Sequence, residues 1–232
     1  MLIAEHRDTL LDALVRMLRA TDPDRDDESA DLPVDTSPTG LLALRACLPE
    51  LATTLHLCGV GLTPVQGTAV VAAVRLVPQL PLPPDRSAAD DAVVARLLGA
   101  DLADARIEAG PPSAPLPDLG WEELGAALAA RASAALPRLA PVEASIVEAR
   151  ALDVARAATL AAAEQDHWTC ARLLRWLPFV DQRDAGLILP LLEYQRIYAG
   201  CDPTVAWSLA VVDHLLDRAA LSADVALGGV PA

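Results

Sequence analysis

Apolar residues recur at helical spacing along most of the chain. Over residues 2–20 they return every three or four positions with charged residues between them, which predicts an amphipathic first helix. The same pattern predicts later helices near 121–136, 142–164, 167–177, 184–199 and 203–220, followed by a fraying tail. We therefore predict an all-α protein, a helical bundle or stacked antiparallel helical hairpins, with no substantial sheet.

Several helix starts are marked by a capping side chain followed by proline at the first helical position. The pairs are Ser37-Pro38, Thr63-Pro64 and Asp202-Pro203. Thr63 and Gln66 are also spaced as a capping box, in which each side chain accepts a hydrogen bond from the other residue's backbone. We predict that helices begin at these three places.

Residues 51–74 contain no charged side chain, and this length is about what a bilayer requires. Glycines and Pro64 interrupt the stretch, and His56 and Gln66 add polar groups that lipid would penalise. Two buried core helices are the better prediction.

Two proline-rich stretches divide the chain, because proline cannot continue a helix. The second, near residues 109–120, is the better boundary. We predict an N-terminal helical region over 1–110, a proline-rich linker over 111–120 and a C-terminal helical domain over 121–232.

Residues 21–38 hold seven acids and one Arg, which predicts a mobile acidic loop. Asp22, Asp24 and Asp26 occupy the first, third and fifth positions of a potential calcium loop. Position six is Asp27 where glycine is needed, and position twelve is Pro33 rather than Glu. A solvated connector is the better interpretation.

The net charge of -14 makes nucleic acid and anionic membranes unfavourable partners, because no basic stripe offsets the acids. All 18 cations are Arg, and Lys and Asn are absent, as a GC-rich genome would produce. Charged residues near the N-terminus leave no apolar centre for a signal peptide, so we expect a cytoplasmic protein. The four cysteines lack a CxxC spacing and are predicted to be free thiols.

Most aromatic residues fall in the C-terminal part of the chain, which suggests a ligand pocket there or, alternatively, large rings filling an Ala-rich core. The candidate ligand-binding residues are Trp168, Trp176, Tyr194, Tyr198 and Trp207.

The same region holds the candidate metal ligands. Glu164, His167 and Cys170 are spaced by three and would share one helical face if the helix continued through Asp166. His214 and Asp217 form a second pair at that spacing, and Glu193 on the intervening helix is a further candidate.

This arrangement partly resembles the Glu-x-x-His pairs of carboxylate-bridged di-iron bundles. The second pair departs from that pattern because its His precedes its acid, so two irons could not be fully ligated. Exposed helix-surface charge is the alternative, and the sequence implies no definite cofactor.

Other catalytic patterns are absent from the sequence. It has neither a GxSxG nucleophile turn nor a phosphate-binding P-loop. Glu193 is the one candidate general base, because its apolar neighbours could desolvate it, although pairing with Arg196 is the alternative.

Two functions follow as hypotheses. The first is a protein-interaction or adaptor module that binds a partner protein or another copy of itself. The second is a small-molecule-binding protein or an enzyme, with a pocket among the C-terminal helices. One form of this hypothesis is a metal-dependent enzyme.

Overall fold

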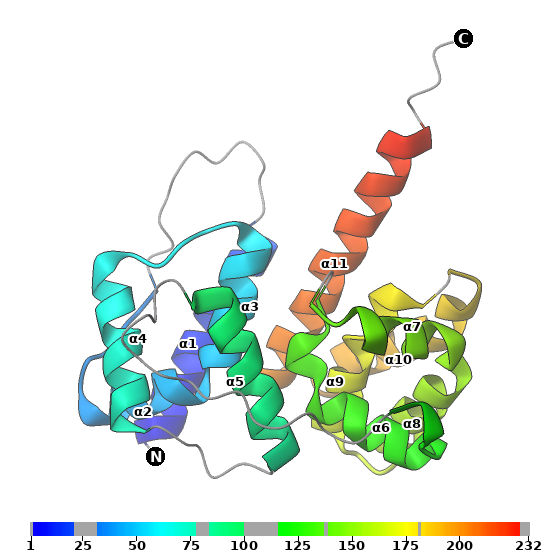
Figure 1. Ribbon diagram of the computed structural model, residues 1–232, viewed down its shortest axis with the longest axis horizontal. Helices are drawn as coiled ribbons and strands as arrows, with labels where there is room; N and C mark the ends of the chain where they lie inside the picture. The colour runs from blue at the N-terminus through cyan, green and yellow to red at the C-terminus, as the bar shows by residue number, and fades with distance from the viewer. Residues whose placement is uncertain are drawn as a thin grey trace.

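A computed structural model of the chain consists of packed helices (Figure 1). It describes residues 2–20, 32–77, 84–99, 116–136, 139–180 and 182–227. These residues form eleven α-helices and three short 3-10 helices and contain no strand, which confirms the all-α prediction. The acids of the calcium-like pattern over 22–31 and linker residues 111–115 lie outside the described residues.

The N-terminal helices are α1 (Leu2–Arg19), α2 (Pro38–Ala46), α3 (Leu48–Cys58), α4 (Pro64–Leu76) and α5 (Pro84–Leu98). The later helices are α6 (Trp121–Ala130), α7 (Pro141–Ala149), α8 (Ala151–Ala163), α9 (His167–Leu174), α10 (Gln182–Tyr198) and α11 (Pro203–Leu227). The 3-10 helices are η1 (Leu116–Asp118), η2 (Ala132–Ala134) and η3 (Leu177–Phe179).

The predicted capping residues begin helices as expected. Ser37 accepts a hydrogen bond from the Gly40 backbone N–H at the start of α2. Thr63 and Gln66 form both bonds of the capping box at the start of α4. Asp202 accepts hydrogen bonds from two backbone N–H groups of α11. Local side-chain chemistry therefore sets these three boundaries.

Two predicted helices are shorter than the periodicity suggested. The single helix predicted over 142–164 is wrong: α7 and α8 are separate helices that meet at Arg150. The Arg150 guanidinium donates to the Leu119 carbonyl at 2.8 Å and to Asp153 at 2.9 Å, and this anchoring holds the chain at the break. Neither proline nor glycine marks the position, so a tertiary contact overrides local helix propensity.

The helix predicted over 121–136 ends at Ala130 instead. Arg172 of α9 donates to the Ala129 and Ala130 carbonyls, at 2.5 and 3.0 Å, and so satisfies acceptors at the end of α6. At the other end of the chain, α11 continues to Leu227, beyond its predicted end near residue 220.

The buried apolar side chains form two clusters, and α11 contributes to both. Leu209 and Val212 belong to the cluster built mainly by α6–α10, whereas Trp207 and Val211 belong to the cluster built mainly by α1–α5. In Figure 1, α11 accordingly rises between the group α1–α5 and the group α6–α10. Two opposite sides of one helix thus join the two clusters.

The uncharged stretch 51–74 forms parts of α3 and α4, which differ in burial. Nearly every residue of α3 is buried, as predicted. Only one side of α4 is buried, so the prediction of a fully buried second helix is wrong. No single described helix is long and apolar enough to cross a membrane, although α2 and α3 together meet that criterion with a bend of 64° between them.

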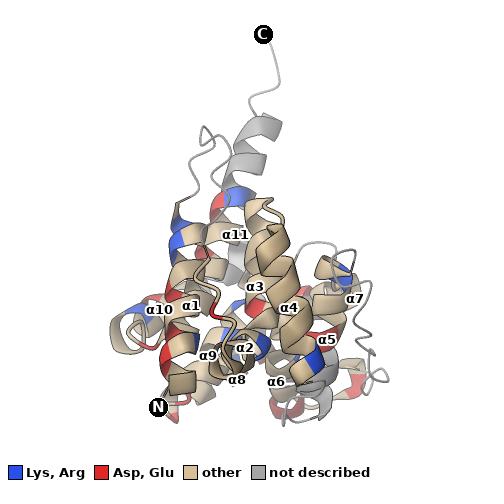
Figure 2. Cartoon of the chain, turned by 90° about the vertical axis from the view of Figure 1, so that its left-hand side faces the viewer, with Lys and Arg blue, Asp and Glu red and all other residues tan. Residues whose placement is uncertain are grey.

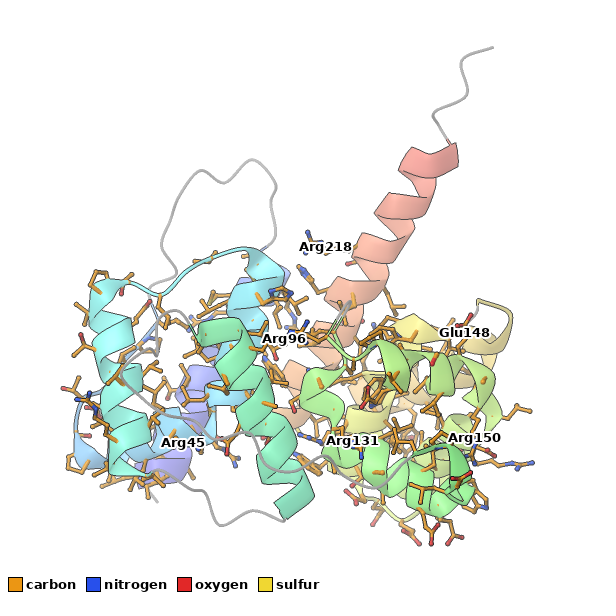
Figure 3. The ribbon with its side chains drawn as sticks, viewed as in Figure 1. Arg45, Arg96, Arg131, Glu148, Arg150 and Arg218 are labelled. Atoms are coloured by element: carbon orange, nitrogen blue, oxygen red, sulfur yellow. The ribbon has the colours of Figure 1, made fainter. Side chains whose placement is uncertain are left out.

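Six charged side chains are buried or nearly buried where α2, α3 and α5 meet α9. We call this set the buried ionic cluster; its members are Arg45, Glu50, Asp90, Asp91, Arg172 and Arg175. Arg45, labelled in Figure 3, lies 3.0 Å from Asp91, and Arg172 lies 3.9 Å from Asp90. Three cations and three acids balance, which reduces the large penalty of removing each charge from water.

Arg175 connects the buried ionic cluster to α11. Its guanidinium stacks on the Trp207 ring, 4.8 Å from the ring centre, and donates to the Ser133 carbonyl at 3.5 Å. The Trp207 indole N–H in turn donates to the Thr54 hydroxyl at 3.0 Å. Burial lowers the pKa of Arg175 to about 9.

Glu50 is the acid of the buried ionic cluster whose pKa is raised in the folded protein. Burial raises the pKa of its carboxyl, and the nearby Asp90 raises it further, against the opposing effect of Arg172 and Arg175. The folded state therefore binds the Glu50 proton more tightly than the unfolded chain does.

We predict that Glu50→Gln removes a pH dependence of stability. Because the folded pKa of Glu50 is raised, the contribution of Glu50 to wild-type stability is fully present below the ordinary carboxyl range and is lost as the pH rises through the raised value. Each unit of that rise is worth about 1.4 kcal/mol. Urea unfolding at several pH values between about 4 and 7 should therefore show Glu50→Gln gaining stability relative to wild type as the pH rises.

Glu122→Gln, at an exposed position on α6, is the control and should show no such trend. If Glu50→Gln instead became progressively less stable than wild type toward neutral pH, the Glu50 carboxylate would be stabilised by Arg172 and Arg175, contrary to the prediction.

Candidate functional site

The aromatic residues predicted to form a pocket are distributed over different parts of the structure. Trp176 and Trp207 are both almost fully buried, but they lie in different apolar clusters. The indole N–H of Trp176 donates to the Leu128 carbonyl at 3.0 Å, and that of Trp207 bonds Thr54. These two rings fill the core and bridge helices.

The other three aromatic candidates lie nearer the surface. The Arg172 guanidinium covers the Trp168 ring at 4.6 Å. Tyr194 and Tyr198 are in contact, with ring centres 4.6 Å apart, and Tyr198 is largely exposed. None of the five aromatic candidates lines any of the three hollows described below.

A turn separates the first set of candidate metal ligands. Helix α8 ends before Glu164, Gln165 has a positive φ of 60°, and Asp166 caps α9 by accepting from the Thr169 N–H. The helix therefore does not continue through Asp166, and Glu164 no longer shares a helical face with His167. Among the residues the structure describes, no group of three or more His, Cys, Asp or Glu side chains is arranged to hold a metal ion.

His167 and Cys170 both approach Gln195, which is completely buried in α10. His167 Nδ1 lies 3.2 Å from the Gln195 amide oxygen. Burial raises the pKa of the Cys170 thiol to about 12, although a hydrogen bond with Gln195 opposes the shift. A neutral thiol is a poor nucleophile and a poor metal ligand, so this group packs α9 against α10.

The remaining candidates lie on α10 and α11. Glu193 is exposed and forms an ion pair with Arg196, so its surroundings do not desolvate it. Asp217 is exposed as well. His214 is buried, and burial lowers its pKa. Neighbouring Arg218, labelled on α11 in Figure 3, donates to the Leu57 carbonyl at 3.2 Å and so ties α11 to the end of α3.

The largest of the three hollows is a groove along α4, which we call the α4 groove. It has a volume of about 900 Å³ and is formed by α2, the turn before α4 and α4 itself. Its apolar and small lining side chains include Leu41, Leu62, Thr68, Val71, Ala72 and Leu76.

The outer side of helix α4 mixes apolar, small and hydroxyl side chains and carries little charge for a helix at the surface. Its buried side packs on α2 through Ala69, Val70 and Ala73. On its outer side Val65 is 71% exposed and Leu76 is 49% exposed. Arg75 is the only charged residue of α4, which is drawn almost entirely in the neutral colour in Figure 2.

A second groove, of about 530 Å³, lies between Trp121 of α6 and the outer side of α8. Leu152 and Leu160 are exposed along it. This surface carries charge, because Arg156 lines the groove and pairs with Asp153 at 3.5 Å. The third hollow, a smaller pocket, lies between α1 and α2.

Sequence reasoning missed the α4 groove, although its signal was present. The absence of charge over 51–74 was interpreted as burial of two helices. For α3 this holds, whereas in α4 the same composition produces an exposed apolar surface. Whether such an uncharged helix is buried or exposed depends on which other helices pack on it, and the sequence alone does not show this.

Comparison with known proteins adds no assignment: neither a family model, nor a curated protein, nor a solved structure matches this chain.

We predict that Cys170 is unreactive in the folded protein. Its pKa of about 12 reduces the thiolate fraction by on the order of a thousandfold relative to an ordinary cysteine, and it is buried as well. In a time course with iodoacetamide followed by peptide mass spectrometry, the exposed Cys201 should be labelled first and Cys170 only on unfolding. Labelling of Cys170 at the rate of Cys201 would show that its thiol is accessible and ionised.

Proposed function

We propose that this chain is a protein-interaction module that binds a helix of a partner protein in the α4 groove. The observation that supports the proposal is the outer side of α4, an exposed helix surface with a single charge on a chain of net charge -14. Large exposed apolar side chains with few charges beside them are a common feature of interaction sites.

The shape of the α4 groove suits an amphipathic helix. Such a helix docks through apolar side chains spaced at i, i+3 or i+4 and i+7. Helix α4 has 13 residues and is therefore about 20 Å long, enough to contact three or four turns of a partner helix. Leu41 and Val71 are partly buried in the cluster below, so the floor of the groove is anchored.

The charge of Arg75 indicates which charge the partner helix should carry. Arg75 lines the α4 groove near the end of α4, so the bound helix should carry a carboxylate opposite it. A second copy of this chain fits less well, because α4 offers no acid to meet Arg75 and each copy carries -14. The partner is therefore a different protein, with an apolar helical stripe and an acid at one end of it.

We predict that acidic substitutions on α4 abolish this binding. Helical peptides of about 15 residues selected from a display library on the wild-type protein should carry the i, i+3 or i+4, i+7 apolar pattern and an acid. Fluorescence anisotropy should show that Thr68→Glu and Leu76→Glu each weaken peptide binding at least about tenfold, because each buries an unpaired charge in the groove.

Val142→Glu is the matched control, since Val142 is 65% exposed on α7 and outside the groove. Arg75→Glu should weaken the same peptides, and replacing their acid with Arg should restore binding to that variant. Selected peptides that bind Leu76→Glu and wild type equally would contradict the proposal. So would α4-dependent dimerisation, or α4-dependent binding to neutral lipid vesicles in place of peptides.

A further inference from the structure

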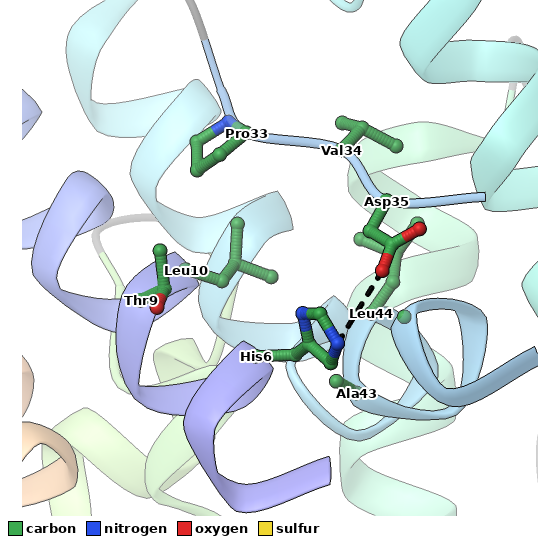
Figure 4. Close-up of a pocket in the computed structure, with 9 residues that line it drawn as sticks. His6, Thr9, Leu10, Pro33, Val34, Asp35, Ala43 and Leu44 are labelled. Atoms are coloured by element: carbon green, nitrogen blue, oxygen red, sulfur yellow. Dashed lines mark ion pairs between the residues drawn. The ribbon is translucent and has the colours of Figure 1, made fainter. Parts of the chain in front are cut away.

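Four buried polar side-chain atoms around Arg175 make no hydrogen bond to any described residue. They are Glu50 Oε2 and Thr53 Oγ1 of α3, Ser133 Oγ of η2 and Nε of Arg175 itself. Each of these side chains is more than nine-tenths buried. None of them lines the α4 groove or the pocket between α1 and α2 (Figure 4), so the inference below is independent of the proposed function.

Arg175 lies next to both Ser133 and Glu50. Its Nη2 donates to the Ser133 carbonyl at 3.5 Å. Burial and Arg172 lower the pKa of Arg175, whereas the charge of Glu50 raises it, so the Glu50 carboxyl group lies within electrostatic reach of the guanidinium. Helix α3, which carries Glu50, also contacts η2, which carries Ser133. The three side chains therefore share one buried region.

Thr53 lies on the same side of α3 as Glu50, because residues three apart share a helical face. The next residue, Thr54, donates its hydroxyl to the Glu50 carbonyl at 2.9 Å. Thr54 also accepts from Trp207, the ring on which Arg175 stacks. The Thr53 hydroxyl is completely buried and has no such bond within the described chain. Buried polar groups of this kind normally bond an ordered water or ion.

The chemistry of the four atoms selects the occupant. The Arg175 Nε–H can only donate, whereas the hydroxyls of Thr53 and Ser133 can donate or accept. Glu50 Oε2 accepts as a carboxylate and donates when protonated. Water suits all of these groups in either state of Glu50. A cation would meet the Arg175 N–H, a halide could not donate to a carboxylate, and the three arginines and three acids of the cluster already balance.

We propose that the buried ionic cluster encloses at least one ordered water molecule, which accepts from Arg175 Nε and hydrogen-bonds Glu50 Oε2. The hydroxyls of Thr53 and Ser133 are its other partners. A buried water typically makes about three hydrogen bonds to groups that would otherwise be unsatisfied, and this site offers four. The water thus joins α3, η2 and the residue that follows α9.

The first test is a crystal structure of the full chain at a resolution that shows ordered water, with a second crystal soaked in bromide. We expect a water peak within hydrogen-bonding distance of both Arg175 Nε and Glu50 Oε2. Direct hydrogen bonds among the four side chains, with no peak between them, would overturn the proposal. An anomalous bromide peak at the site would also overturn it, because the occupant would then be an anion.

The second test counts long-lived internal waters in solution by magnetic relaxation dispersion of the water oxygen nuclei. Thr53→Val combined with Ser133→Ala removes two of the four partners, so this variant should lose at least one long-lived water relative to wild type. Thr159→Val should keep the wild-type count, since its hydroxyl bonds the Ala155 carbonyl in the groove between α6 and α8. An unchanged count in the double variant, shown to be folded by circular dichroism, would contradict the proposal. If the double variant does not fold, the wild-type crystal structure decides.

Discussion

The buried ionic cluster is the constraint on which the arrangement of the helices depends. Removing one member of a buried ion pair typically costs 3–5 kcal/mol, because the opposite charge is left without compensation in a medium of low polarity. Arg172 of α9 bonds carbonyls at the end of α6, and Arg175, which follows α9, bonds a carbonyl of η2. Both arginines face acids from α3 and α5. Apolar contacts between Ala- and Leu-rich helices tolerate sliding, whereas these bonds have fixed directions. The cluster therefore links α9 to α3 and α5, and Trp207 extends it to α11.

How far the sequence predicts the fold depends on the range of each interaction. Ser37, Thr63 and Asp202 act within their own first turn, so they could be recognised from neighbouring residues. The break at Arg150 could not, since it depends on a carbonyl of Leu119 that only the folded chain brings near. The buried arginines were equally hidden, because an Arg in a helical pattern is normally read as a residue on the solvent side.

The candidate sites follow the same division. The C-terminal His, Cys and Glu residues suggested a site because of their residue types. In the fold, Cys170 is a buried neutral thiol that packs between helices. Glu193 is exposed and paired with Arg196. His6 and Asp35 carried no signal, because their pairing requires α1 to lie against the segment before α2. Residues far apart in sequence and unremarkable in composition thus form an ion pair.

Helix α2 lies between the α4 groove and the smaller pocket that His6 and Asp35 line. Leu41 faces the α4 groove, whereas Gly40, Ala43 and Leu44 face that pocket. The fit on the pocket side is tight, since a Cβ on Gly40 would lie 2.4 Å from the Asp35 carbonyl oxygen. An occupant that displaced α2 on one side would change the binding surface on the other, and thermodynamic linkage would make that coupling reciprocal.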